Sequence, residues 1–260
     1  MPLYLDHNAT TPLDPRVLEA MRPWLLGAHG NPASVHKPGR AAHTALENAR
    51  AEVAALVGAK PAEVIFTGGG TEADNLALKG VCYGKPNGQL LIGAIEHAAV
   101  QGPADALAEM GWSVERIPVD GEGRYDLAAL EGFLAKKDAR LVSAMLANNE
   151  TGVLQDVAAM AARAHQAGAL FHSAAVHAAG KIPVDFRALG ADLMTLSAHK
   201  LNGPRGVGAL IMDRRVDLKP LVHGGGQEQG LRGGTENLAG IVGFGKAAAL
   251  AAQELEEHAN

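Results

Sequence analysis

The feature that most constrains the fold of this chain is the alternation of short apolar runs with longer segments of helical period. The seven runs have the length and composition of strands and lie at 63–67, 89–95, 113–118, 140–146, 169–173, 191–197 and 206–212. Segments rich in Ala, Leu and Glu separate most of them, and we expect helices at 71–82, 98–110, 126–136 and 156–167. This alternation predicts an α/β fold with a mainly parallel seven-stranded sheet and helices on both faces.

The two ends of the chain depart from this pattern. Only eight residues separate the last two runs, which is too few for a crossover helix, so 206–212 is expected to run antiparallel to its predecessor. Further helical patterns precede and follow the sheet, at 15–27, 39–57 and roughly 238–258. We therefore predict an N-terminal arm over 1–14 and one large domain, with its N-terminal helices, over 15–260.

The composition argues against several classes of partner and site. With a formal net charge of −5, the chain offers no basic surface for a nucleic acid or an anionic membrane. No apolar run approaches the roughly 20 residues of a membrane span, and the first residues do not resemble a signal peptide, so a cytoplasmic protein is expected. The single cysteine, Cys82, excludes an internal disulfide and any CxxC metal or redox motif.

Three glycines follow the first predicted strand, in the stretch "GGGTEADN". Glycines let a backbone come close to a ligand, and Thr71 begins a helix whose free N–H groups and dipole favour an anion such as phosphate. The stretch is neither GxGxxG nor GxxxxGK. Taken alone, it is explained more simply as an ordinary tight turn between a strand and a helix.

Polar side chains also follow four later strands. They are His97, the run Asn148, Asn149 and Glu150, the pair His172 and Ser173, and the group Ser197, His199 and Lys200. Each of these residues also has a common structural explanation. Single histidines are usually structural, Asn-Asn pairs are common in turns, and lone lysines are usually solvated. The carboxyl ends of parallel strands share one edge of a sheet, however, so these residues can converge on one crevice.

Lys200 gives this crevice a specific chemistry. A lysine at the rim of an apolar, glycine-lined pocket beside an anion site suits a Schiff base, because desolvation and nearby positive charge lower the pKa of its amine. The cofactor that combines a phosphate with an aldehyde is pyridoxal 5′-phosphate. In such a site His97 can stack on the cofactor ring, and Asn149 can hydrogen-bond its phenolic oxygen.

With these residues, the sequence resembles the cysteine desulfurases of the NifS/IscS-like branch, within the class V aminotransferase group of pyridoxal-phosphate enzymes. The matching stretches span nearly the whole chain in order and are "YLDHNATTPLDPRV", "GNPASVHKPGR", "VIFTGGGTEADNLALKG", "EHAAV", "NNETGVLQD", "AAGKIPVDF", "SAHKLNGPRGVGAL" and "HGGGQEQGLRGGTENLAGIVGFGKA". The resemblance implies the large domain of a fold type I pyridoxal-phosphate transferase. Such an enzyme converts L-cysteine to L-alanine and transfers the sulfur for iron–sulfur cluster or thio-cofactor assembly.

The resemblance also implies roles for individual residues. Lys200 would form the Schiff base, and Lys200 and His97 are the candidate catalytic residues. The implied phosphate contacts are Gly70, Thr71, Ser197 and His199, and the implied ring contacts are His97 and Asn149. Family members are homodimers in which the threonine matching Thr235 reaches the partner's phosphate. A homodimer is therefore expected here, with a sulfur acceptor or an iron–sulfur scaffold protein as a further partner.

Two departures from the family pattern bear on activity. Ala174 stands where the family has an aspartate that keeps the ring nitrogen protonated, and His177 stands where it has a glutamine. Without that carboxylate we expect carbanion chemistry to slow by orders of magnitude, while His177 is close enough in sequence to take a neighbouring role in the cofactor site. Family enzymes also continue into a small C-terminal domain that carries the catalytic cysteine and a substrate-binding arginine, and this domain is expected to be missing here.

Two other functions stay open from the sequence. The first is a non-catalytic scaffold or regulatory protein that keeps the fold and the dimer surface but not turnover. The second is zinc binding, without HxxxH or HxH spacing, by the histidines at the strand exits, namely His97, His172, His177 and His199. Cys82 is not expected to carry a persulfide, because it lies about 16 Å along its helix from Thr71 at ~1.5 Å per residue.

Overall fold

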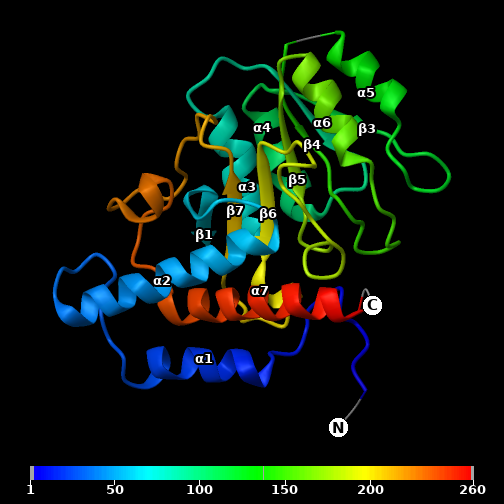
Figure 1. The fold of residues 1–260 in the computed structure, drawn as a ribbon. Coiled ribbons are helices and arrows are strands. Elements are labelled where there is room, and N and C mark those ends of the chain that lie inside the picture. Colours follow the sequence, from blue (N-terminus) through cyan, green and yellow to red (C-terminus); the bar gives the residue numbers. More distant parts are fainter. Residues whose placement is uncertain (1–2, 137, 259–260) are drawn as a thin grey trace.

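The computed structural model describes residues 3–136 and 138–258, and a seven-stranded sheet with helices packed around it forms its centre (Figure 1). The strands are β1 (Val64–Thr67), β2 (Gln89–Gly93), β3 (Ser113–Ile117), β4 (Ala139–Ser143), β5 (Leu170–Ala174), β6 (Leu193–Ser197) and β7 (Gly208–Met212). Each falls within or overlaps one of the seven apolar runs. The predicted α/β class and the number of strands are confirmed.

The strands lie side by side in the order β1-β7-β6-β5-β4-β2-β3. As the short connection before it predicts, β7 runs antiparallel to β6, and it is also antiparallel to β1. The other neighbouring strands are parallel. Because two reversals restore the original direction, β1 points the same way as β6. The carboxyl ends of all strands except β7 therefore share one edge of the sheet.

Seven α-helices are described: α1 (Pro15–Leu26), α2 (Lys37–Leu56), α3 (Gly70–Cys82), α4 (Ala98–Glu109), α5 (Leu127–Leu134), α6 (Val157–Gln166) and α7 (Leu238–His258). Short 3-10 turns lie at Pro61–Glu63, Ala198–Lys200 and Gln227–Gly230. The start of a helix is often set by a capping side chain: Asp126 accepts hydrogen bonds from backbone N–H groups in the first turn of α5, and Asp156 does the same for α6. All the predicted helices are present within a few residues.

Alternate side chains of the strands enter two hydrophobic cores, one on each face of the sheet. On one face Ile65 and Leu90 pack with residues of α3 and α4, such as Leu76 and Leu107. On the other face the core includes residues of α2, α6 and α7, and it is built from Phe66, Phe171, Val53, Met160 and Phe244. The site edge of the sheet is therefore held rigidly from both sides.

Helix α7 is the one helix in the described part of the chain that could cross a membrane by length and composition, over Leu238–Leu255. In the structure it packs against α1 and α2, with Phe244 fully buried. The packing is close, because a Cβ at Gly245 would lie 2.5 Å from the Cα of Ala49 in α2. We therefore interpret α7 as a core helix of this domain.

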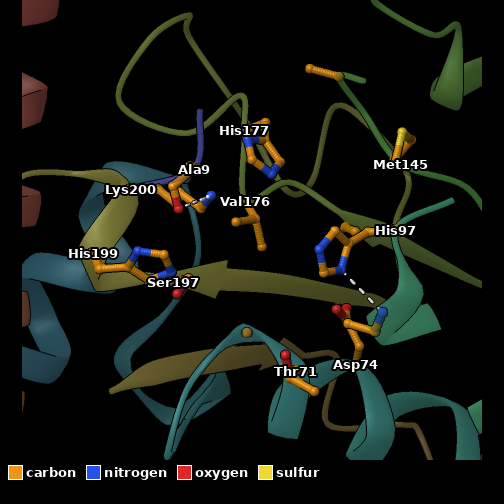
Figure 2. Close-up of a pocket in the computed structure, with 14 residues that line it drawn as sticks. Ala9, Thr71, Asp74, His97, Met145, Val176, His177, Ser197, His199 and Lys200 are labelled. Carbon is orange, nitrogen blue, oxygen red and sulfur yellow. Dashed lines mark hydrogen bonds between the residues drawn. The ribbon is translucent and has the colours of Figure 1, made fainter. Parts of the chain in front are cut away.

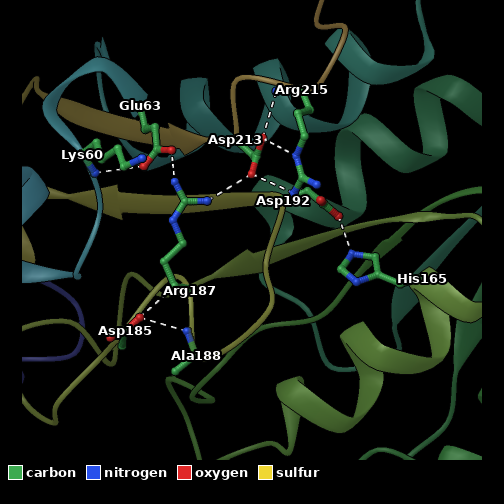
Figure 3. A network of polar contacts seen from close by, with 9 residues as sticks. All are labelled: Lys60, Glu63, His165, Asp185, Arg187, Ala188, Asp192, Asp213 and Arg215. Atoms are coloured by element: carbon green, nitrogen blue, oxygen red, sulfur yellow. Dashed lines mark hydrogen bonds and ion pairs between the residues drawn. The ribbon is translucent and has the colours of Figure 1, made fainter.

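The opposite edge of the sheet carries a network of ion pairs (Figure 3). Arg187 links Glu63, just before β1, to Asp213, just after β7, and its Nη1 lies 3.0 Å from Oδ2 of Asp213. Arg215 also binds Asp213, at 2.9 Å, and this hydrogen bond holds the pKa of the Asp213 carboxyl well below its usual range. Asp192, before β6, pairs with His165 of α6 at 2.7 Å. These contacts link the segments before β1 and β6 and after β7. They lie at the edge of the sheet opposite the carboxyl ends of the parallel strands.

Candidate active site

A cavity of about 280 Å³ lies at the edge formed by the carboxyl ends of the strands (Figure 2). Seven of the nine residues that the sequence assigns to a site line it: Gly70, Thr71, His97, His177, Ser197, His199 and Lys200. The remaining lining residues are Ala9, Asp74, Ala99, Met145, Ala147, Ala174 and Val176. Residues more than a hundred positions apart in the sequence therefore converge as the parallel sheet predicts.

The glycine turn at the start of α3 is positioned by the antiparallel strand β7. Thr67, at the end of β1, and Ser197, at the end of β6, both pair with Gly208. A Cβ at Gly208 would lie 2.5 Å from the backbone carbon of Gly69 and 2.8 Å from the nitrogen of Gly70. Only glycine at position 208 allows the turn to sit this close to Ser197, which brings the N-terminus of α3 into the cavity.

Replacing Gly208 by alanine is therefore expected to destabilise the protein. The new methyl group meets backbone atoms that cannot rotate away, so the cost is about 1–3 kcal/mol, as for other overpacked positions. The matched control is Gly102→Ala in α4, where a Cβ meets nothing within 4 Å and alanine favours the helix. The midpoints of urea unfolding measure both effects. Equal midpoints for the two variants would show that the turn tolerates a side chain at 208.

Lys200 ends the 3-10 turn that follows β6, and its amine points towards the N-terminal arm. The Nζ atom donates hydrogen bonds to the backbone oxygens of Asn8 and Ala9, at 2.9 Å to the latter. Burial lowers the pKa of Lys200, and the positive charge of Lys181 lowers it further, while Asp6 opposes them. At a given pH, more of this amine is unprotonated and nucleophilic than in a solvated lysine.

Three imidazoles surround the cavity. His97 caps α4, and its Nδ1 accepts a hydrogen bond from the N–H of Ala99 at 3.0 Å. Burial lowers the pKa of His177 to about 4, with the charges of nearby lysines and histidines adding to the effect, and its buried Nδ1 has no partner among the described residues. Burial also lowers the pKa of His199, whose Nδ1 lies 3.1 Å from the hydroxyl oxygen of Thr10. His177 and His199 are thus neutral at pH 7.

Asp74 is a cavity residue that the sequence analysis missed. It lies one turn after Gly70 on the same face of α3, and it is only 3% exposed. Burial raises the pKa of Asp74 to about 7. The signal in the sequence is a carboxyl group in the middle of an apolar helix face, since its neighbours on that face, Ala73, Leu76 and Ala77, are all buried.

His172 lies beside Asp74, with its Nε2 atom 3.6 Å from Oδ1 of the aspartate. Both ring nitrogens of His172 have hydroxyl partners, Ser143 at 2.8 Å and Thr195 at 3.0 Å. Burial lowers the pKa of His172 to about 3, so the ring is neutral. Within the described part of the chain, no three histidine, cysteine, aspartate or glutamate side chains are grouped as metal ligands, so the four strand-exit histidines do not form the zinc site.

The other two predicted site residues lie outside the cavity. The side chain of Asn149 donates to Glu150 at 2.6 Å, and its backbone oxygen accepts from Asn8 at 2.8 Å. Thr235 is exposed in the loop before α7. Cys82 is also remote: it is 1% exposed at the far end of α3, and burial raises the pKa of its thiol to about 12. This thiol is packed rather than reactive.

Residues 3–260 match the model of the aminotransferase class-V family, and the chain belongs to that family. It is 49% identical over 252 residues to a cysteine desulfurase of Cereibacter sphaeroides, covering 96% of this chain and 65% of that relative. It is 44% identical to a cysteine desulfurase IscS of Dictyoglomus turgidum, covering 98% of this chain and 65% of the relative. The chain thus spans about two thirds of the length of these relatives.

Solved structures agree with this assignment. The fold superposes on a NifS-like protein with a TM-score of 0.95 at 41% identity, covering 100% of this chain and 72% of the other. A structure described as SspA in complex with cysteine matches with a TM-score of 0.91 at 35% identity, covering 95% of this chain and 72% of that one. The mostly parallel sheet and the resemblance to NifS/IscS-like cysteine desulfurases are confirmed.

Proposed function

We propose that this chain is the pyridoxal 5′-phosphate-binding part of an enzyme that resembles cysteine desulfurases. The observation that carries the proposal is that the Lys200 amine, with its lowered pKa, shares one cavity with the glycine turn at the start of α3. An amine beside an anion-favouring helix terminus suits a cofactor that joins an aldehyde to a phosphate.

The residues of the cavity fit such a cofactor. At the phosphate end, a Cβ on Gly70 would come within 3.3 Å of the Ser197 side chain, so the absence of a side chain leaves room for an anion between the helix terminus and the Ser197 and Thr71 hydroxyls. A wider hollow continues there to Arg205, whose positive charge favours a phosphate. Around the ring, the buried Nδ1 of His177 is without a protein partner among the described residues, as expected of a group that meets a ligand.

When bound, pyridoxal 5′-phosphate supplies an aldehyde and a ring that withdraws electrons from the substrate's α-carbon. The protein's part is to hold and orient it. Lys200 is the attachment point and can move a proton at the α-carbon, and Thr71, Ser197 and His199 orient the phosphate. His97 forms one wall of the cavity. Its Nδ1 accepts a hydrogen bond from the N–H of Ala99, so its Nε2 faces away from the helix. This geometry favours stacking on the ring.

Ala174 favours a second candidate, a non-catalytic scaffold that keeps the fold. It lines the cavity but brings only a methyl group. Release of alanine and sulfide from L-cysteine by the cofactor-loaded chain would rule out the scaffold. L-cysteine as substrate, a homodimer and a sulfur acceptor are parts of the proposal that follow from the family, and a cytoplasmic location stays an expectation from the sequence. The division into an arm over 1–14 and a large domain stays a prediction.

The proposed cofactor is tested by adding pyridoxal 5′-phosphate to the purified chain. We expect a near-ultraviolet or visible absorption band that neither component shows alone, saturating at one cofactor per chain and persisting after dialysis. A phosphate ester without an aldehyde serves as the blank, because it cannot form a Schiff base with Lys200. If the spectrum stays the sum of the two components at every concentration, the proposed function is wrong.

A further inference from the structure

The Asp74 carboxyl is the feature of the cavity that the proposed function does not yet use. It is the one carboxyl group among the residues that line the cavity. Its Oδ1 atom is fully buried and has no hydrogen-bond partner within the described structure. A buried carboxyl oxygen without a partner is costly, so it requires either a proton or a ligand that supplies one.

The position of Asp74 matches one atom of the proposed cofactor. In Figure 2, Asp74 and Lys200 lie on opposite sides of the cavity, with Thr71 below and between them. In pyridoxal 5′-phosphate the aldehyde is attached to C4 of the pyridine ring. The ring nitrogen lies opposite C4, and the arm that carries the phosphate is attached to C5, the neighbour of C4. With the aldehyde at Lys200 and the phosphate near Thr71, the ring nitrogen faces the side on which Asp74 lies.

The two histidines on that side have protein partners at three of their four ring nitrogens. Both nitrogens of His172 have hydroxyl partners, and Nδ1 of His97 accepts from Ala99. Ala174 offers no polar atom. Of the described side chains that line this part of the cavity, Asp74 alone combines an acidic group with an unpartnered, buried oxygen.

We propose that Oδ1 of Asp74 binds the ring nitrogen of the cofactor and so takes the place of an acidic residue at position 174. The proposal rests on the proposed function. One proton lies between the two atoms, carried either by the carboxyl group or by the ring nitrogen, so the pair keeps the same charge in both forms. Burial supports the pairing, because it raises the pKa of Asp74 to about 7, close to the range in which a pyridine nitrogen titrates.

The test compares two probes, pyridoxal 5′-phosphate and its 1-deaza analogue, in which a C–H replaces the ring nitrogen. We expect the wild-type chain to bind the natural cofactor at least tenfold more tightly than the analogue, measured by absorption titration. In Asp74→Leu, which is similar in volume but cannot hydrogen-bond, this ratio is expected to fall to about one. Circular dichroism and the melting temperature verify that the variant is folded.

The matched control is Glu96→Gln. Glu96 is another buried acid close to the site, and its Oε2 is likewise without a partner among the described residues, but its Oε1 accepts from the Tyr125 hydroxyl at 2.8 Å and it does not line the cavity. We expect this variant to keep the wild-type ratio. A wild-type ratio near one overturns the role of Asp74, even if both variants prove unstable. An unchanged ratio in folded Asp74→Leu overturns it as well. Absence of binding by either probe would instead remove the proposed function itself.

Discussion

Replacing Lys200 by alanine is expected to abolish the borohydride-stable attachment of pyridoxal 5′-phosphate to this chain. Its amine is half-buried in the cavity and held by the backbone oxygens of Asn8 and Ala9. Its lowered pKa leaves more of the amine unprotonated than in a solvated lysine, and Lys200 is the one lysine among the residues that line the cavity. Mass spectrometry of the peptides after reduction measures the attachment, and we expect the label on the Lys200 peptide to fall from nearly one per chain to none.

Lys181 provides the matched control. Its amine donates to the side-chain oxygen of Asn8 at 3.2 Å, so it lies near Lys200, but it does not line the cavity. Lys181→Ala is expected to keep full attachment at Lys200. Because the charge of Lys181 lowers the pKa of Lys200, its removal raises that pKa and shifts the pH profile of attachment to higher pH. Equal labelling of Lys200→Ala and the wild type would place the reactive amine elsewhere.

The hydrogen bonds of Lys200 are a part of the site that the sequence does not predict. Alternating apolar runs predict the strands, and the rule that parallel strand ends share an edge predicts that Lys200 meets the glycine turn. The hydrogen bonds from Lys200 to Asn8 and Ala9 join residues about 190 positions apart. No local pattern encodes such a contact, because it depends on how the arm crosses the finished sheet. The sequence analysis therefore assigns no site residue to 1–14, whereas in the structure Ala9 lines the cavity.

Asp74 and Asn149 show what the sequence does not specify about the site. The predicted helix over 71–82 includes Asp74, but its pattern of residue types does not predict that this carboxyl group is buried beside His172. The contact of Asn149 with the cofactor ring stays a prediction, and in the structure its side chain hydrogen-bonds Glu150 and does not line the cavity. In both cases the strand or helix was placed correctly. The direction of a single side chain depends on packing that a pattern of residue types does not specify.

Removing the carboxylate of Glu228 is expected to cause the largest loss of stability. Glu228 binds Arg50 of α2 through two hydrogen bonds of 2.8 Å, and both side chains are buried, 2% and 8% exposed. The same carboxylate accepts from the N–H of Phe66 in β1, and Arg50 also donates to the oxygen of Val64 at 2.7 Å. One ion pair therefore fixes the loop after β7 against both α2 and β1.

Glu228→Ala leaves the buried Arg50 guanidinium with only the 44%-exposed Glu47 as a counter-charge, at 2.9 Å, and a broken buried pair costs about 3–5 kcal/mol. Because a domain of this kind is stable by only ~5–15 kcal/mol, the urea midpoint should fall by a large fraction. Glu19→Ala breaks a pair with Arg22 whose side chains are 61% and 55% exposed, so no measurable change is expected. If the two variants lose the same stability, the buried pair is not what holds the loop. If only Glu228→Ala is destabilised, the loop that carries Thr235 depends on the same charge pair that anchors β1, the strand leading into the glycine turn.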